Sequence, residues 1–168
     1  MRKAIAIVAG IVILVLVDFS IYSRERLLTE GSVVFLELAP VDPRSLMQGD
    51  YMALRFQVEN ALRASARESE LKRDGLVVVA LDERRVGSYA RVDLGTPANS
   101  NEMKIRFRLR NDRVKFATNA YFFQEGTAQL YSKARYGEFR VDGNGDALLT
   151  ALRDEKLAPL GVAADGVK

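Results

Sequence analysis

An uninterrupted apolar run near the N-terminus constrains this chain more than any other feature. After a short basic start come 14 residues without a polar side chain, Ala4–Val17, and the stretch continues to Tyr22. As an α-helix, residues 4–22 extend about 28 Å, close to the ~30 Å hydrocarbon core of a bilayer. Asp18 lies near the end of the run, where an ionised group costs much less than at its centre. We therefore expect residues 1–28 to form an N-terminal membrane anchor.

Two other interpretations of this segment remain open. A cleaved signal peptide has the same basic start and apolar core, but it also needs small residues at positions −3 and −1 of the cleavage site. The available pairs, Asp18/Ser20 and Ile21/Ser23, each contain one unsuitable residue, so a retained helix is favoured. A buried core helix is disfavoured, because nothing else in the chain is so uniformly apolar.

The charges around the run favour a cytoplasmic N-terminus. Arg2, Lys3 and the terminal amino group precede the run, whereas Arg24 and Arg26 follow it with Glu25 between them. Under the positive-inside rule, the folded domain then lies outside the cytoplasm.

The rest of the chain, residues 30–168, suffices for one folded domain with its own core. The sequence has no cysteine and no histidine, which excludes disulfides, thiol chemistry, Cys/His zinc sites and histidine-dependent catalysis. With Arg2, Lys3 and Asp18 set aside, 23 basic residues stand against 21 acidic ones, a balance that does not indicate nucleic-acid binding. We expect no cofactor and no metal.

Alternating segments predict a mainly antiparallel sheet. Met103–Arg110 alternates apolar and basic residues at all eight positions, and Asn111-Asp112 indicates a hairpin turn after it. Pairing across this turn keeps one face apolar and the other basic, since it sets Leu109 against Val114, Phe107 against Phe116, Arg110 against Arg113 and Arg108 against Lys115. Further strands are predicted at Ser32–Ala39, Tyr51–Val58, Leu76–Leu81, Val86–Asp93, Tyr136–Asp142 and Ala147–Leu152, with Tyr121–Phe123 continuing the second hairpin strand.

One or two short helices complete the expected fold. Asn60–Lys72 indicates a helix or a mobile excursion, and Glu125–Ala134 indicates a short helix. Asp142–Asp146 resembles the start of a calcium loop, but Arg153 occupies the place of the bidentate glutamate, so a hairpin turn is expected there. The expected fold class is α+β, with a single mainly antiparallel domain preceded by the transmembrane helix.

A short motif, Gly49-Asp50-Tyr51-Met52-Ala53-Leu54-Arg55-Phe56, follows a proline-rich loop. Its structural interpretation is a sharp turn at Gly49, fixed by Asp50, that leads into a strand whose Leu54 and Phe56 face the core. The functional alternative is a pocket to which the motif and two other segments contribute. Its candidate residues are Asp42, Arg44, Gly49, Asp50, Tyr51, Leu54, Phe56, Arg135, Tyr136 and Glu138.

This motif resembles the one that defines the GDYXXLXY family of membrane-anchored bacterial proteins, whose function is uncharacterised. Pro40–Arg44, Phe122–Gly126 and Arg135–Glu138 also resemble that family, so the resemblance covers about residues 30–161. Phe56 stands where the motif has its last tyrosine, and any role of that hydroxyl is absent here. The resemblance implies a single-pass protein of the bacterial inner membrane with a periplasmic domain. It also implies association with polytopic membrane proteins, and no known activity.

These observations leave three hypotheses for function. The first is a non-enzymatic accessory protein that binds a polytopic membrane protein. The second is an envelope-binding module whose basic hairpin face contacts anionic lipid or polymer, since each basic group near an anionic membrane contributes about 1 kcal/mol. That face consists of Lys104, Arg106, Arg108, Arg110, Arg113 and Lys115, and its structural alternative is a solvated face balanced by acidic neighbours. The third is a carboxylate-based hydrolase using Asp50, Glu138 and Tyr51.

Overall fold

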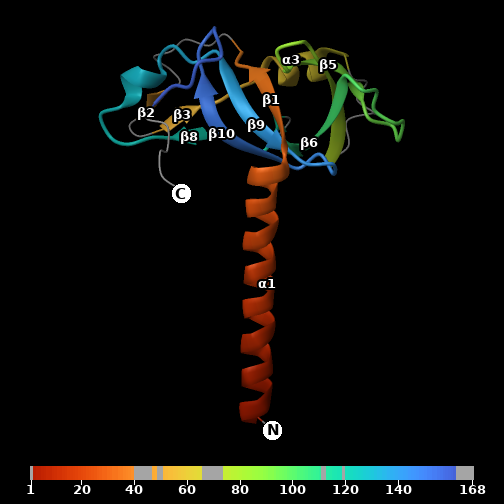
Figure 1. Cartoon of the computed structure of the whole chain (residues 1–168), viewed down its shortest axis with the longest axis vertical. Coiled ribbons are helices and arrows are strands. Elements are labelled where there is room, and N and C mark those ends of the chain that lie inside the picture. Colours follow the sequence, from red (N-terminus) through yellow and green to blue (C-terminus); the bar gives the residue numbers. More distant parts are fainter. Residues whose placement is uncertain are drawn as a thin grey trace.

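A long N-terminal helix projects from a curled β-sheet domain in the computed structural model of the chain (Figure 1). The structure describes residues 2–39, 47–48, 51–65, 74–110, 113–118 and 120–161. The elements are α1 (Arg2–Glu30), β1 (Ser32–Glu37), β2 (Met47–Gln48), β3 (Tyr51–Ala53), α3 (Gln57–Ser65), β4 (Asp74–Leu81), β5 (Val86–Val92), β6 (Glu102–Arg110), β7 (Arg113–Lys115), β8 (Ala120–Phe122), the 3₁₀ helix η1 (Ala128–Tyr131), β9 (Tyr136–Val141) and β10 (Ala147–Arg153). The expected α+β class is confirmed.

Helix α1 runs without interruption through 29 residues, so it is about 44 Å long. It contains the predicted segment 4–22 and continues to Glu30. The part from Ile7 to Glu30 is long and apolar enough to cross a membrane, and its most apolar stretch is not buried against the domain. The helix reaches the domain only at its C-terminal end, where Leu27 is buried.

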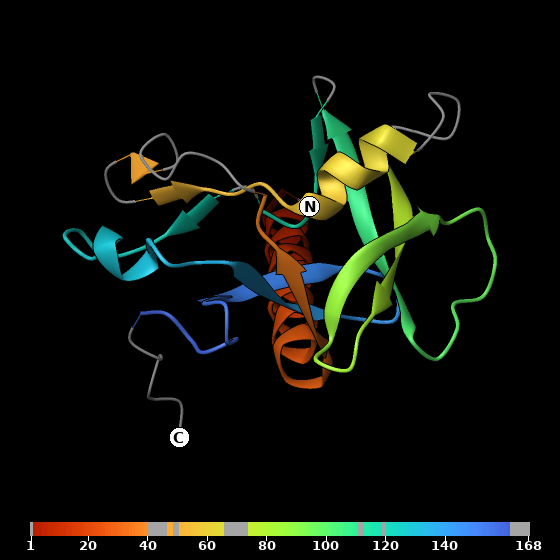
Figure 2. The ribbon, with the colours of Figure 1, turned by 90° about the horizontal axis from the view of Figure 1, so that it is seen from above.

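Among the described strands, seven form the main sheet in the order β10-β9-β1-β5-β4-β6-β7. β1 and β5 run parallel, and the other neighbours pair antiparallel, as expected for a mainly antiparallel sheet. Seen from above, the sheet curls strongly between β9 and β6 (Figure 2). This curl brings the β9–β10 turn onto β6, where the backbone N–H of Arg106 donates to the carbonyl of Gly145 at 2.7 Å.

The core lies on the inner side of this curl. β4 is an interior strand between β5 and β6, and its Val77, Val78 and Val79 are fully buried. This confirms the central strand predicted at Leu76–Leu81. Helix α3 packs against β1, β5 and β7 and buries Val58 and Leu62.

The β6–β7 hairpin has the predicted register, with Arg108 opposite Lys115, Leu109 opposite Val114 and Arg110 opposite Arg113. β7 ends at Lys115, so Phe116 lies beyond the ladder although it is buried in the core.

The continuation predicted at Tyr121–Phe123 was wrong. After β7 the chain turns at Thr118, whose hydroxyl bonds to both backbone groups of Ala120. β8 then pairs with β3 in a separate three-stranded sheet, β2-β3-β8.

Three other elements differ from prediction. The strand expected at Tyr51–Val58 ends at Ala53, and α3 begins at Gln57, because the Phe56 carbonyl accepts the Glu59 N–H as the first helical hydrogen bond. The helix expected at Asn60–Lys72 therefore starts earlier; within the described residues it ends at Ser65, and 66–73 lie outside them. The helix expected at Glu125–Ala134 is only the short η1.

Three hairpin turns are built in the same way around an aspartate. In each, one carboxylate oxygen accepts the backbone N–H groups two and four residues later, at 2.7–2.9 Å. The residue three positions later has positive φ. The aspartates are Asp82, Asp142 and Asp154, and the positive-φ residues are Arg85, Gly145 and Leu157. The hairpin turn predicted at Asp142–Asp146 is therefore confirmed, and β9 and β10 pair across it.

Replacing Asp82 with alanine is expected to lower the free energy of unfolding by about 1–2 kcal/mol, because the N–H groups of Arg84 and Val86 lose their acceptor. Asp82→Asn retains an acceptor oxygen and should lose less than half as much. Urea unfolding of the detergent-solubilised protein measures both values. Equal losses in the two variants would contradict this account of the turn.

Candidate functional site

The second half of the motif and β9 meet in the core. The ring of Phe56 is fully buried and lies edge-on to the ring of Phe139, with centroids 5.2 Å apart. It also covers Gly137, where an added Cβ would come within 2.9 Å of the Phe56 ring. Leu54 is buried in the same cluster. These contacts support the structural interpretation of Leu54 and Phe56, and they explain why position 137 needs a glycine.

The rest of the predicted pocket is only partly described. Asp42, Arg44, Gly49 and Asp50 lie outside the described residues. Tyr51 is half-buried on β3, and its ring lies 5.8 Å from that of Phe122 on β8. A pocket that joins these residues to Arg135 and Glu138 therefore stays a prediction.

Glu138 is held in a buried ion pair. Its Oε2 accepts from Nε of Arg153 at 2.6 Å, and Nη2 of Arg153 contacts the same oxygen. Nη1 of Arg153 donates to the carbonyl of Leu157. A hydrolase that used Glu138 as acid or base would have to break this pair first. The geometry therefore gives Glu138 a structural role, as a cross-link between β9 and β10.

The neighbouring candidates lie at the start of β9. Arg135 is exposed, and its Nη2 lies 3.8 Å from Oε1 of Glu37. Tyr136 is half-buried and lies opposite Glu37 in the β1–β9 ladder. In the part of the chain that is described, no group of three acidic side chains is placed to hold a metal ion.

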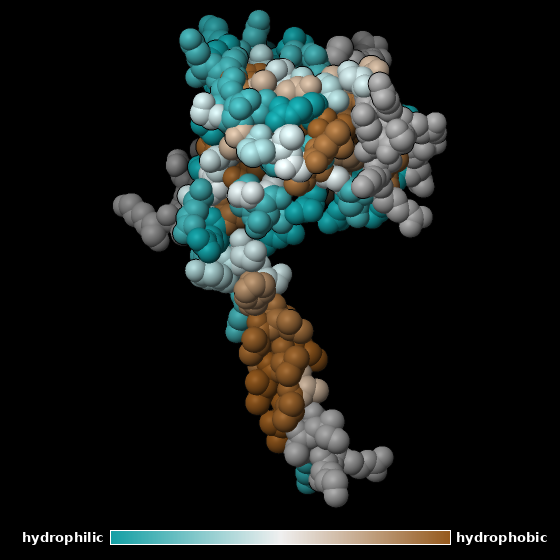
Figure 3. Space-filling model, turned by 90° about the vertical axis from the view of Figure 1, so that its right-hand side faces the viewer, coloured by the Kyte–Doolittle hydropathy of each residue, from teal (hydrophilic) through white to brown (hydrophobic). Residues whose placement is uncertain are grey.

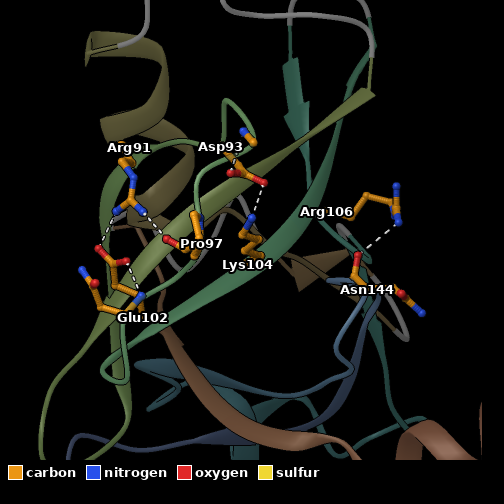
Figure 4. Close-up of polar contacts among 9 residues, drawn as sticks. Arg91, Asp93, Pro97, Glu102, Lys104, Arg106 and Asn144 are labelled. Carbon is orange, nitrogen blue, oxygen red and sulfur yellow. Dashed lines mark hydrogen bonds and ion pairs between the residues drawn. The ribbon is translucent and has the colours of Figure 1, made fainter.

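Two members of the predicted basic face are paired with carboxylates. Figure 4 shows the contact of Lys104 with Asp93 and that of Arg106 with Asn144. Nζ of Lys104 lies 2.8 Å from Asp93, and this hydrogen bond lowers the pKa of the Asp93 carboxyl. Nε of Arg106 lies 2.8 Å from Asp146, and its Nη2 donates to the carbonyl of Asn144. Both pairs connect β6 to loops, so these two charges help to hold the curl of the sheet.

The remaining members carry more available charge. Nη1 of Arg110 lies 3.7 Å from Asp74, and both side chains are about half exposed. Arg108 and Lys115 form no ion pair with any described residue. The backbone of Arg113 belongs to β7, and its side chain is outside the description. Acidic neighbours therefore balance the charges of Lys104 and Arg106, as the structural alternative expects. They balance the charges of Arg108, Arg110 and Lys115 only weakly.

A groove of about 630 Å³ separates this less balanced end from α1, and we call it the basic groove. Its helix wall includes Phe19, Ser20, Ser23, Arg24 and Leu27, and its domain wall includes Arg106, Arg108, Arg110 and Lys115. A second groove of the same volume, the mixed groove, is lined by Arg26 and Lys104 but also by Glu30, Glu102 and Asp142. Figure 3 shows that the hydrophobic surface of the helix gives way to hydrophilic surface directly below the domain.

Glu59 is a buried ionisable residue that the sequence did not reveal. It is 8% exposed, and its Oε1 has no hydrogen-bond partner among the described residues. Burial raises the pKa of Glu59 to about 7, against the opposing effects of the Phe56 backbone N–H, Arg55 and Lys115. In the sequence, only a position in the first turn of a helix could have drawn attention to Glu59. That position was not recognised, because a strand was predicted across Phe56 and Val58, directly before it.

The fold defines a class of protein in which a β-rich domain is continuous with an apolar N-terminal helix. The family model described as GDYXXLXY protein matches residues 13–152, and the chain therefore belongs to the GDYXXLXY family. The match begins within α1 and ends in β10, so it includes most of the helix as well as the sheet. No curated protein and no solved structure matches the chain.

Proposed function

We propose that this protein is a non-enzymatic accessory protein, anchored by α1 in the bacterial inner membrane, that presents its periplasmic domain to a polytopic membrane partner. The proposal combines the spanning length of α1 with a domain whose buried acid–base pair, Glu138 and Arg153, serves the fold. The observation that carries it is the junction between the helix and the sheet.

The junction has no flexible linker. Helix α1 ends at Glu30 and β1 begins at Ser32, so a single residue, Gly31, joins them. The Gly31 N–H donates to the Leu27 carbonyl, and Nη1 of Arg140 donates to the Gly31 carbonyl. A Cβ at Gly31 would lie 2.3 Å from the Leu27 carbonyl oxygen, so a larger residue would force the chain apart.

This junction suits a protein that works on a neighbour in the same membrane. A helix fixed to its domain holds every surface of that domain at one height above the bilayer. A freely diffusing ligand does not require this restriction, whereas a partner held in the same plane does. The basic residues before the apolar run support a periplasmic position of the domain under the positive-inside rule.

Membrane attachment and sidedness are tested first. The chain has no cysteine, so a cysteine introduced in place of the exposed Leu94 provides a unique label. We expect a membrane-impermeant maleimide to label Leu94→Cys in intact spheroplasts, and the purified protein to retain the mass of residues 4–22. Labelling only after lysis, or loss of that mass, would contradict the proposal.

The partner is tested by photo-crosslinking in membranes. We expect a photoreactive residue in place of Phe122, which is 75% exposed on β8, to capture one polytopic membrane protein. Inserting Gly-Ser-Gly-Ser between Glu30 and Gly31 should reduce the adduct at least several-fold without releasing the protein from the membrane. The same insertion after Thr96, in an exposed loop, serves as the control. Capture that is unaffected by the junction insertion would contradict the role of the junction.

A further inference from the structure

We infer that the basic groove binds the headgroup of one anionic phospholipid. This inference rests on the proposed insertion of α1 in a membrane, and it adds a ligand that the partner proposal does not require. Three features of the groove support it: its charge, its depth relative to the bilayer, and its contrast with the mixed groove.

The charge of the basic groove is unbalanced. Among the described residues, its lining contains five basic side chains, and the only acidic ones are Asp142 and Asp146. One oxygen of Asp142 accepts two turn N–H groups, and Asp146 is paired with Arg106. Arg24, Arg108 and Lys115 have no ion-pair partner in the residues that are described. Guanidinium and ammonium groups gathered in this way suit a phosphate, which accepts several charge-assisted hydrogen bonds.

The helix wall of the groove lies at the depth of lipid headgroups. The apolar segment 4–22, whose length matches the hydrocarbon core, ends at Tyr22, and Ser23 and Arg24 follow within about 3 Å along the helix. The headgroup layer extends roughly 5–8 Å beyond the hydrocarbon on each side. Ser23 and Arg24 therefore fall within this layer, and Ser20 lies one turn deeper, at the edge of the hydrocarbon. A lipid beside α1 would have its acyl chains against the apolar helix and its phosphate beneath the β6–β7 hairpin.

The mixed groove provides an internal comparison. It has the same volume and shares Ser23 and Leu27 of α1 with the basic groove, but its two basic side chains meet three acidic ones. Both of these basic residues are already paired, Arg26 with Glu30 and Lys104 with Asp93. The domain's unpaired basic side chains that face α1, Arg108 and Lys115, therefore lie on one side of the helix. Nonspecific attraction to a membrane surface would not require such a concentration, whereas one bound headgroup does.

The size of the groove agrees with a single headgroup. Its volume of about 630 Å³ lies within the usual range of 300–1,000 Å³ for small-molecule sites.

The test is native mass spectrometry of the full-length protein in detergent, titrated with palmitoyl-oleoyl phosphatidylglycerol or the matching phosphatidylcholine. We expect one phosphatidylglycerol to be retained in preference to phosphatidylcholine. The double variant Arg108→Gln/Lys115→Gln should weaken retention by roughly tenfold to thirtyfold, since each basic group contributes about fivefold. The control Arg63→Gln/Lys133→Gln makes the same change of charge at exposed positions outside the groove and should retain the lipid as the wild type does.

Three results of the lipid titration would overturn the inference, and the competitor below adds a fourth: equal retention of both lipids, unchanged retention in the Arg108/Lys115 variant, or an equal loss in the control. Millimolar sn-glycerol 3-phosphate is the competitor that separates a lipid from a free phosphate. Displacement at that concentration would mean that the groove serves a soluble phosphomonoester, which also overturns the assignment. Failure here with α1 still inserted in the membrane would leave the anchoring proposal intact, so the two failures are distinguishable.

Discussion

Replacing Arg153 with methionine should destabilise the protein by about 3–5 kcal/mol, the largest loss we expect from any single change described. Arg153 is the ion-pair partner of Glu138, whose side chain is about one-tenth exposed. Without Arg153 that carboxylate is left charged in the protein interior, and such uncompensated burial costs far more than the pair itself contributes. The Leu157 carbonyl also loses its donor. Urea unfolding followed by tyrosine fluorescence measures the change.

Two further variants make this prediction specific. The double variant Glu138→Met/Arg153→Met removes the charge together with its partner and should recover most of the lost stability. Arg110→Met breaks an ion pair whose members are about half exposed, and it should cost less than about 1 kcal/mol. A double variant as unstable as Arg153→Met would mean that Arg153 acts through packing rather than through the charge of Glu138.

Replacing Glu59 with glutamine should stabilise the protein above neutral pH. Because burial raises the pKa of Glu59 to about 7, the folded state favours the neutral carboxyl. Its contribution to stability is fully present below the unfolded pKa of about 4.5 and is lost as the pH rises through 7. Glutamine remains neutral throughout. We expect the advantage of Glu59→Gln over the wild type to grow by about 2–3 kcal/mol between pH 5 and pH 8.

The pH dependence separates this effect from a general gain in packing. The lowered pKa values of Asp93 and Glu102 affect stability only in acid, well below this range. Unfolding free energies of wild type and variant are therefore compared at half-unit steps from pH 5 to 8, with Glu83→Gln as the exposed control. An advantage of Glu59→Gln that is the same at every pH would show that the carboxyl does not titrate near 7.

The hairpins could be predicted from the sequence because they depend on local signals. Met103–Arg110 alternates strictly, so only one register with the next strand keeps its apolar residues on one face, and β6 and β7 adopt that register. The aspartate–glycine turn between β9 and β10 is equally local. The apolar helix was predicted from a single continuous run.

Features that depend on distant contacts were not predictable. Met52, Leu54, Phe56 and Val58 fit a strand by their period of two, yet the strand ends at Ala53. Phe56 instead packs onto Gly137, far along the chain, and α3 begins immediately after it. Because α3 begins immediately after Phe56, Glu59 lies in the first turn of that helix and is buried there.

The candidate sites likewise have one part that local sequence predicts and another that depends on tertiary contacts. The basic face was predicted from alternation alone, but its division into paired and unpaired charges depends on the curl of the sheet. Asp93 and Asp146, which pair with Lys104 and Arg106, come from loops on either side of β6. No local pattern places them there. The basic groove also depends on the position of α1, which is a tertiary property.

Because Gly31 joins α1 directly to β1, the helix acts as a lever on the whole domain. Transmembrane helices tilt by about 20° on average, and they tilt further in thinner bilayers. A tilt of that size lowers one edge of an attached body by roughly 7 Å for every 20 Å of its width. With α1 spanning a membrane as proposed, local membrane thickness would set how closely one flank of the sheet approaches the lipid, and the protein's orientation would respond to the composition of the bilayer around it.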